Sequence, residues 1–434
     1  MTRRPRAPAA TGRRPGHSPG RLLPLGLIFL LAAGPAAAEN APDALPGATL
    51  DTVLAIARRL SPELATRALE TEAAQARVDI AGSWDDPTLR VTSDEIDRTT
   101  GPRQNKMIYS VEQEIPLWGK RDLRRDAARA EADQMAAEGR SAEADLIEKV
   151  KVAFAQYYQT DQAIRTTHDL HGVVHDIATL ARDRYTQNRG TQQEIFKAEV
   201  ESARIEIEIA RLEASSRAAK GRLNALLARP IDAPLAKPAR SRHLPPGGTL
   251  VPAALLERAR VANPGLQSSS AIIAGAESNR RLAEKSWYPD ITISASAIDR
   301  TGNGPNGYMA AIGLKVPLQF GLHSAQEHEA TAKFGAARAR RQVLEQQIEG
   351  DLAEAVASLS SSHATADLIG TQLLPKSEAL VRSGVAAYAA GRAQLTDVLM
   401  AEHDLADLRV QLLSAEFDTQ RQLAAIERLI GGDL

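Results

Sequence analysis

The sequence repeats itself, and this internal duplication constrains the fold more than any other feature. Matching residues occur in the same order in both halves, always about 200 positions apart. The matched pairs are Thr49–Leu50 with Thr249–Leu250, Trp84 with Trp287, Pro116 with Pro317, and Gly190 with Gly391. Because one offset holds along the whole chain, we expect two copies of one structural unit.

Each copy follows one predicted plan: helix, strand hairpin, very long helix, tight turn and closing helix. We expect repeat 1 at 39–230, a proline-rich linker at 231–248 and repeat 2 at 249–434. The predicted strands are 87–97, 106–116, 290–300 and 307–317. The predicted helices are 49–83, 119–189 and 191–228 in repeat 1, and 250–286, 320–390 and 391–429 in repeat 2. An aromatic content of only 4% favours long helices over a compact mixed core.

Residues 1–38 have the pattern of a signal peptide. Six arginines accompany an apolar run of about ten residues that begins at Leu22, and alanines at 36–38 supply a cleavage site. An ordinary amino-terminal helix is the alternative, and the prolines in this segment disfavour it. Removing the segment leaves 47 basic and 54 acidic residues, a net charge of about −7, which disfavours nucleic acid as a partner. The chain has no cysteine, so we expect neither disulfides nor a lipid-modified cysteine.

The four predicted strands alternate apolar and polar residues. In the first strand, apolar Leu89 and Val91 flank polar Arg90. Such alternation places one face of a sheet on an apolar phase, and about ten residues let a tilted strand cross a bilayer. Four strands cannot close a barrel in lipid, so several chains would share one, and three copies would supply twelve strands. The alternative is two hairpins that cap a soluble helical domain.

The long predicted helices exceed the size of a globular domain. No proline lies between Pro116 and Pro230, so 119–189 is predicted as one helix of about 70 residues and about 100 Å. Its counterpart 320–390 contains only Pro375, where we expect a kink. Heptad seams follow in the closing helices, formed by Ile195, Ala198, Ser202, Ile205, Ile209 and Leu212, and by Leu395, Val398, Leu405 and Leu412. These patterns predict a tall helical cylinder, with an ordinary solvated coiled coil as the alternative.

The order of these features resembles the TolC-like outer-membrane efflux proteins. The signal peptide, the two repeats, the strand ending EIPLWGKR and the segment AAGRAQLTDVLMAEHDL carry the resemblance over about residues 45–430. The resemblance implies a mainly α fold with a β-barrel portion. In that fold a homotrimer places a twelve-stranded barrel in outer-membrane lipid and a helical barrel in the periplasm. It also implies a periplasmic adaptor and an inner-membrane pump as partners. The segment QEIPLWGKRDLR is similar to the CusC- and CzcC-like heavy-metal branch.

The resemblance further implies a gate and a docking tip. Asp397, six residues after Gly391, matches the position of acidic rings that narrow the pore, and Met400 stands where relatives often carry a second acid. An adaptor would touch the tip turns at Gly190–Thr191 and Gly391–Arg392. Without the resemblance, Asp397 is an ordinary solvated helix residue, and the glycines only terminate helices.

Two similar segments, EIPLWGK at 114–120 and KVPLQFG at 315–321, mark the exits from strand to helix. Pro116 and Pro317 lack the N–H group that would continue a strand ladder. Gly119 and Gly321 permit the swivel into a helix. We therefore expect these four residues at the junction between barrel and tunnel.

Three histidines, His168, His171 and His175, share one face of the predicted helix 119–189. Imidazoles in this arrangement can bind a transition metal, but the sequence assigns them no acidic or cysteine partner, so a plain helix wall is the alternative. His323 and His328 are a weaker case of the same pattern. No nucleophile elbow, P-loop, HExxH or dinucleotide motif is present, so we expect neither an enzyme nor a cofactor.

The leading hypothesis is the outer-membrane channel of a tripartite efflux system. Its expected cargo is heavy-metal cations or small toxic compounds. One alternative is a type I secretion channel. Another, of a different class, is a soluble periplasmic coiled-coil scaffold or adaptor.

Overall fold

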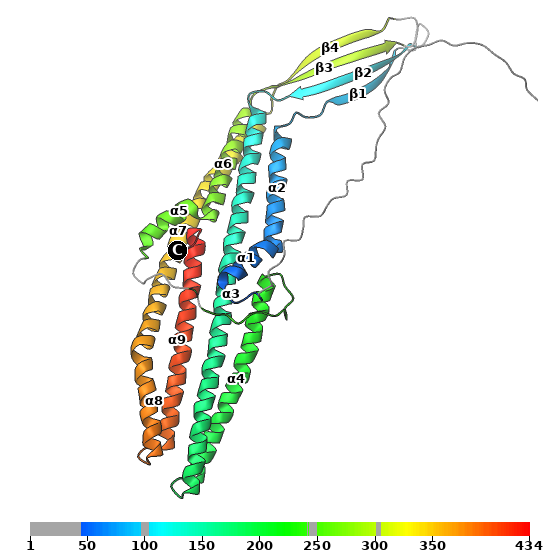
Figure 1. Cartoon of the computed structure of the whole chain (residues 1–434). Coiled ribbons are helices and arrows are strands. Elements are labelled where there is room, and N and C mark those ends of the chain that lie inside the picture. Colours follow the sequence, from blue (N-terminus) through cyan, green and yellow to red (C-terminus); the bar gives the residue numbers. More distant parts are fainter. Residues whose placement is uncertain (1–44, 97–103, 241, 243–249, 301–304) are drawn as a thin grey trace, which may run out of the picture. The chain divides into compact units, whose positions relative to one another are not determined.

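The computed structural model describes residues 45–96, 104–240, 242, 250–300 and 305–434. The described elements belong to one unit, Leu45–Leu434. The predicted signal peptide 1–38 and part of the predicted linker 231–248 lie outside the described residues. Long helices with one four-stranded sheet make up the unit, which confirms the predicted mainly α fold (Figure 1).

The two halves have the same order of elements. Repeat 1 contains α1 (Leu50–Leu60), α2 (Pro62–Gly82), β1 (Thr88–Ile96), β2 (Gln104–Ile115), α3 (Lys120–Thr186) and α4 (Gln192–Leu226). Repeat 2 contains α5 (Pro252–Ala262), α6 (Pro264–Lys285), β3 (Asp290–Arg300), β4 (Gly307–Lys315), α7 (Phe320–Leu368), the π-helical turn η1 (Ile369–Leu373), α8 (Leu374–Ala389) and α9 (Leu395–Ile430).

The strands form one antiparallel sheet in the order β1-β2-β3-β4, so β1 and β4 are its edges. The register places Leu89 opposite Val111, Val111 opposite Ala295, and Ala295 opposite Ala310. The apolar positions of all four strands therefore lie on one face of the sheet, because side chains alternate between faces along each strand. The other face carries polar residues such as Ser110.

The first helix of each repeat is broken, which corrects the prediction of single helices at 49–83 and 250–286. Ser61 separates α1 from α2 with a ψ of 117°, and Asn263 separates α5 from α6 with a ψ of 121°. Each of the two residues precedes a proline, whose ring disfavours helical geometry in the residue before it. Both side chains then accept a hydrogen bond from the N–H three residues ahead and cap the new helix.

The long helix of repeat 1 is continuous, whereas that of repeat 2 is not. The helix α3 has 67 residues, which at 1.5 Å per residue is about 100 Å. In repeat 2, η1 widens five residues between α7 and α8 into a π-helix. Pro375 explains this position, because its ring lacks an N–H group and collides with the carbonyl four residues earlier in a regular helix. The predicted kink at Pro375 thus appears as a π-helical turn just before that residue.

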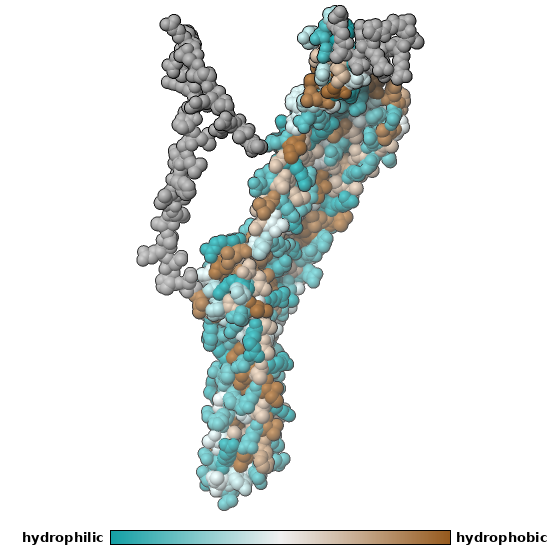
Figure 2. Space-filling view, turned by 90° about the vertical axis from the view of Figure 1, so that its right-hand side faces the viewer, coloured by the Kyte–Doolittle hydropathy of each residue, from teal (hydrophilic) through white to brown (hydrophobic). Residues whose placement is uncertain are grey.

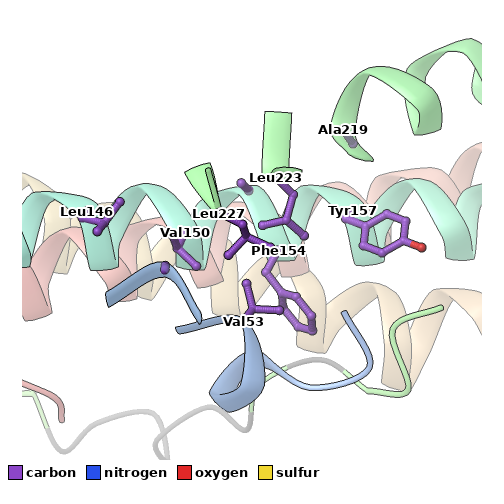
Figure 3. Close-up of a cluster of buried hydrophobic side chains, with 10 residues drawn as sticks. Val53, Leu146, Val150, Phe154, Tyr157, Ala219, Leu223 and Leu227 are labelled. Carbon is purple, nitrogen blue, oxygen red and sulfur yellow. The ribbon is translucent and has the colours of Figure 1, made fainter. Parts of the chain in front are cut away.

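Each repeat has its own hydrophobic cluster where its short first helix, α1 or α5, packs on its long helix, and we call this level the waist. The two clusters share a set of corresponding positions. In repeat 1 the short α1 packs on α3 through Val53, Ala57 and Val150, and the end of α4 adds Leu223 (Figure 3). Counterparts in the repeat 2 cluster, each 202 residues later, are Leu255 for Val53, Ala259 for Ala57, Ile348 for Leu146, Leu352 for Val150 and Ala355 for Ala153. The duplication thus preserves packing as well as sequence motifs.

The helix α3 is the spine of the unit. It packs against α2 and α4 of its own repeat and against α6 and α9 of repeat 2. Among the residues that the structure describes, no helix is long and apolar enough to cross a membrane.

Candidate functional site

At the first strand-to-helix exit the backbone turns sharply. Pro116 follows the end of β2, and both Trp118 (φ 63°) and Gly119 (φ 75°) adopt left-handed geometry before α3 begins. Glycine tolerates this geometry, while tryptophan there is strained unless its surroundings hold it. Trp118 is held, because its ring nitrogen donates to the Pro289 carbonyl at 2.9 Å.

An ion pair fastens this exit to the start of the next hairpin. The ammonium of Lys120 is 2.8 Å from Asp290 Oδ2 and donates to the Tyr288 carbonyl at 2.8 Å. The other oxygen of Asp290 accepts from the Leu117 N–H at 3.1 Å. Lys120 is only 6% exposed, so the pair lies in a site from which most water is excluded. Sequence reasoning missed this pair, although Lys120 directly follows Gly119 of the predicted junction and Asp290 begins the third predicted strand.

The second exit is built differently. Pro317 follows β4, but Gly321 lies inside α7 and has no left-handed geometry. The helix begins directly at Phe320. Phe320 is 65% exposed, and Leu318 is 72% exposed. The ring of Trp287 stacks on Phe320 with centroids 6.2 Å apart. The exit of repeat 2 therefore lies at a free edge of the sheet, where the chain supplies no counterpart to the Lys120–Asp290 pair among its described residues.

The two predicted tip turns also differ. Gly391 is left-handed (φ 75°) and closes α8, as expected for a glycine at a helix end. In repeat 1 the left-handed residue is Asn188 (φ 56°), whereas Gly190 lies two positions later. Thr191 then caps α4 by accepting from the Glu194 N–H at 3.3 Å. The backbone N–H of Arg392 donates to the Ala387 carbonyl at 2.8 Å and completes the other turn.

One buried tyrosine joins the two helical hairpins that end in these turns, α3–α4 in repeat 1 and α8–α9 in repeat 2. Tyr388 of α8 is 1% exposed, and its hydroxyl donates to Glu194 Oε2 of α4 at 2.9 Å. The guanidinium of Arg184 lies over the Tyr388 ring at 4.3 Å and also donates to the Tyr388 carbonyl. Burial, followed by the hydrogen bond to Glu194, raises the pKa of Tyr388 to about 12. This three-residue contact was invisible in the sequence, because its members have no local motif.

Asp397 lies in the first turn of α9, where its side chain is exposed. A carboxylate there interacts favourably with the positive end of the helix dipole. Met400, one turn later, is 67% exposed. Both residues are thus free to face a solvent-filled space, and the gate role of Asp397 stays a prediction.

The three histidines of α3 do not converge. His171 is bonded through Nε2 to Ser202 Oγ at 3.2 Å and lies 3.5 Å from Glu206 Oε1, whereas His168 and His175 are exposed. In repeat 2, His323 binds Ser286 Oγ through Nδ1 at 3.0 Å. Across the described ranges, no three histidine, cysteine or acidic side chains are placed to hold a metal ion.

A second buried ion network ties the repeats together at the waist. Lys151 of α3, 6% exposed, is 2.7 Å from Glu427 Oε2 near the end of α9. The guanidinium of Arg242, from the predicted linker, binds both oxygens of Glu427. Burial raises the pKa of Glu427, but the hydrogen bonds from Arg242 and Lys151 outweigh that effect and lower it.

Known proteins share this architecture. A family model described as "Outer membrane efflux protein" matches residues 53–229 and 255–432. The cobalt-zinc-cadmium resistance protein CzcC of Cupriavidus metallidurans is 25% identical over 391 residues, which cover 88% of this chain and 90% of CzcC. The crystal structure of the outer membrane protein VceC from Vibrio cholerae has a TM-score of 0.76 at 21% identity, over 88% of this chain and 96% of VceC. A crystal structure of CusC has a TM-score of 0.77 at 14% identity, over 88% of this chain and 92% of CusC.

Proposed function

The chain belongs to the outer membrane efflux protein family and is an outer-membrane protein, and we propose that three copies form a conduit from the periplasm to the exterior. In this proposal the conduit is the outer-membrane component of a tripartite efflux system and has no enzymatic step. A periplasmic adaptor and an inner-membrane pump complete the path.

The observation that carries the proposal is the exposed apolar face of the sheet. Leu89, Tyr308 and Ile312 are 76%, 90% and 78% exposed, and the register places them on the same face. Such a face is stable against lipid, but the unpaired edges of β1 and β4 are not, since lipid offers backbone groups no hydrogen bonds. Closure by further copies satisfies both edges.

The opposite face of the sheet suits a water-filled lumen. It carries the ion pairs Arg90–Glu112, at 3.7 Å, and Lys315–Glu114, at 3.3 Å. On the face seen in Figure 2, hydrophilic side chains are spread along the helical part of the unit. A wall that is wet on both sides is what a helical tunnel in the periplasm requires.

The tip of the tunnel is the proposed meeting point with the adaptor. Its docking surface would comprise the turns at Gly190, Thr191, Gly391 and Arg392. Three Asp397 carboxylates would narrow the pore within the same tip. The Tyr388–Glu194 bond supports this assignment, because it holds the two hairpins of one chain together at that level.

Heavy-metal cations are the proposed cargo, with small toxic compounds as the broader class. The similarity to CzcC, whose name specifies cobalt, zinc and cadmium resistance, supports the metal assignment. A net charge of about −7 after removal of the predicted signal also suits a conduit that passes cations.

The test is deletion of this chain followed by growth on cobalt, zinc, cadmium, copper and organic toxicants, with the wild-type gene restored as the control. We expect reduced tolerance to metals. Unchanged tolerance to every compound would remove efflux and leave a secretion channel. Fractionation supplies the second test, in which we expect heat-labile trimers in the membrane. A chain that is fully soluble without detergent would instead be a periplasmic scaffold.

A further inference from the structure

One column of the α9 seam changes from apolar to charged and back. The residues that recur every seven positions on this helix are Leu395, Glu402, Arg409, Glu416, Leu423 and Ile430. A period of seven keeps side chains on the face that contacts neighbouring helices. The central three positions therefore place charges in a column whose two ends are apolar.

The apolar seam of α4 in repeat 1 also has a column with a period of seven, and that column carries no charge. It begins at Ile195 and continues through Ser202, Ile209, Ser216 and Leu223. Ser202, its second member, is bonded to His171 at 3.2 Å. The seam column of α9 is therefore interrupted by charges, whereas the seam column of α4 is not.

Glu402 is the most unusual member of this column. It is 4% exposed and lies between Ala401 and Leu405, which pack with Val381 of α8 in one apolar cluster. Within the part of the chain that the structure describes, its carboxylate has no hydrogen bond and no ion pair. Burial of an unpaired carboxylate in such a place disfavours its ionised form.

The cations of α8 and α9 near Glu402 are committed elsewhere. Arg409, seven residues along α9, donates to Glu378 Oε1 of α8 at 3.0 Å. Arg382 of α8 lies 4.0 Å from the other oxygen of Glu378, with 72% of its side chain exposed. Burial raises the pKa of Glu402, and the field of Arg409 lowers it by less.

The helix α3 also packs against α9 and brings no compensating charge. The two helices run antiparallel, since Ile177 of α3 clusters with Val398 while Lys151 pairs with Glu427. The titratable groups of α3 at the level of Glu402 are therefore His171, His175 and Asp176. His171 is bonded to Ser202, and the other two are exposed.

We propose that Glu402 is a proton-binding site that sets how tightly α9 packs against α8 and α3. The protonated acid fits the closed seam, and ionisation of its carboxylate loosens the seam between the tip and the waist. This proton-binding site belongs to the helical hairpin α8–α9, and its role does not depend on what the conduit carries.

The direction of the pH effect on the seam follows from which state, closed or opened, binds the proton more firmly. Because burial raises the pKa of Glu402, the closed seam binds the proton better than an opened one. The closed seam is therefore stabilised at acidic pH, and this stabilisation is lost as the pH rises through the raised pKa. Burial also raises the pKa of Glu416, two heptads along, so that group acts in the same direction.

The test is amide hydrogen exchange of segment 395–412 in the full-length assembled protein, with each variant compared with wild type at the same pH. Glu402→Gln keeps the shape of the side chain without its charge. At pH 7.5 we expect this segment to exchange at least about threefold more slowly in Glu402→Gln than in wild type, and at pH 5 equally fast. Asp404→Asn, an exposed carboxylate on the same helix, is the matched control and should change nothing.

A second variant keeps the test decisive if Glu402→Gln assembles poorly. Glu402→Ser also removes the carboxylate, and it should protect this segment relative to wild type at pH 7.5 more than at pH 5 once the intrinsic exchange rates at each pH are divided out. Identical exchange in wild type and Glu402→Gln at both pH values would overturn the proposal. An Asp404→Asn chain that reproduces the Glu402→Gln result would also overturn it, because the effect would then be one of net charge.

Discussion

The two long helices of the chain share a sequence plan but not a structure. In repeat 1, α3 runs unbroken through 67 residues and contacts helices of both repeats. In repeat 2, η1 interrupts the path between α7 and α8, whose main contacts are with helices of their own repeat. A helix fixed on both sides has little freedom, whereas one at an edge tolerates a wide turn. The two copies of one plan thus differ, because one forms a continuous helix between both repeats and the other an interrupted helix within its own repeat.

The two exits from the sheet differ in the same way. The first exit meets the next hairpin of its own chain and is fastened there by Lys120 and Asp290. The second exit leaves from the edge strand β4, and Phe320 stays exposed. In the proposed trimer, a neighbouring copy would cover this second exit. Substitutions at the two exits test whether the first is held more firmly than the second.

The largest expected effect concerns the buried ion pair. Lys120→Met leaves Asp290 without its cation in a site where the lysine side chain is 8% exposed and the aspartate 16%. We expect a loss of about 3–5 kcal/mol in stability, because an uncompensated buried charge is costly. The measurement is the midpoint of thermal loss of helical circular dichroism, in detergent.

The matched control lies on the same sheet. Lys315→Met removes a cation from an exposed pair, with side chains 71% and 43% exposed, and should cost no more than about 1 kcal/mol. Adding Asp290→Asn to Lys120→Met should recover part of the loss. Equal midpoints for the two single variants would show that the first exit is no more firmly held than the second.

The next effect is a pH dependence at the tip contact. The pKa of Tyr388 is about 12 in the folded chain, above the ordinary value of 10, so the folded state holds the phenol proton more tightly. The stabilisation is complete below pH 10 and is lost as the pH rises toward 12. At 1.36 kcal/mol per pKa unit it amounts to about 2–3 kcal/mol.

The measurement is the difference in thermal midpoint between wild type and Tyr388→Phe across this pH range. Wild type should be the more stable protein at pH 9, and its advantage should shrink above pH 10. Tyr185→Phe, at the same tip but 46% exposed, is the control and should show no such trend. A constant difference between wild type and Tyr388→Phe would remove the proton-linked role of the tyrosine.

Local patterns were sufficient to predict most of the fold. Alternation such as that around Arg90 depends only on neighbouring residues, and the four strands lie where it predicts them. The duplicated motifs likewise predicted two units with the same order of elements. The breaks at Ser61 and Asn263 were missed, although both residues precede proline and the rule for such residues was available.

The contacts between distant residues could not be predicted in this way. Tyr388 and Glu194 lie 194 positions apart, and neither carries a motif that indicates the other. Lys120 and Asp290 lie 170 positions apart. Packing brings such pairs together, and a single sequence without relatives does not record packing. The roles of Asp397 and the tip turns stay predictions for the same reason.

The third prediction compares the glycines of the two exits. Gly119→Ala forces a left-handed alanine into a position where no neighbouring atom obstructs the new methyl group, so the cost is backbone strain of about 1–2 kcal/mol. Gly321→Ala places the same methyl group in open space inside a helix, where alanine is better by about 1 kcal/mol. The thermal midpoint should fall in the first variant and rise in the second. A fall of similar size in both would mean that Gly321 has a role which its helical geometry does not reveal.

The smallest expected effect compares the two tip turns. Left-handed geometry falls on Gly391 in repeat 2 but on Asn188 in repeat 1. Gly391→Ala should lower stability by about 1 kcal/mol, because a Cβ atom disfavours this geometry. Gly391→Asn should cost only a few tenths of a kcal/mol, since asparagine occupies such helix ends naturally and Asn188 already does so in the same chain. Among the described residues, the new Cβ would approach only Arg184 Nη2, at 4.0 Å, so crowding cannot account for a larger loss. If Gly391→Asn were as damaging as Gly391→Ala, the turn of repeat 2 would need glycine for a contact beyond its own backbone, and docking of a partner at the tip would be the first contact to examine.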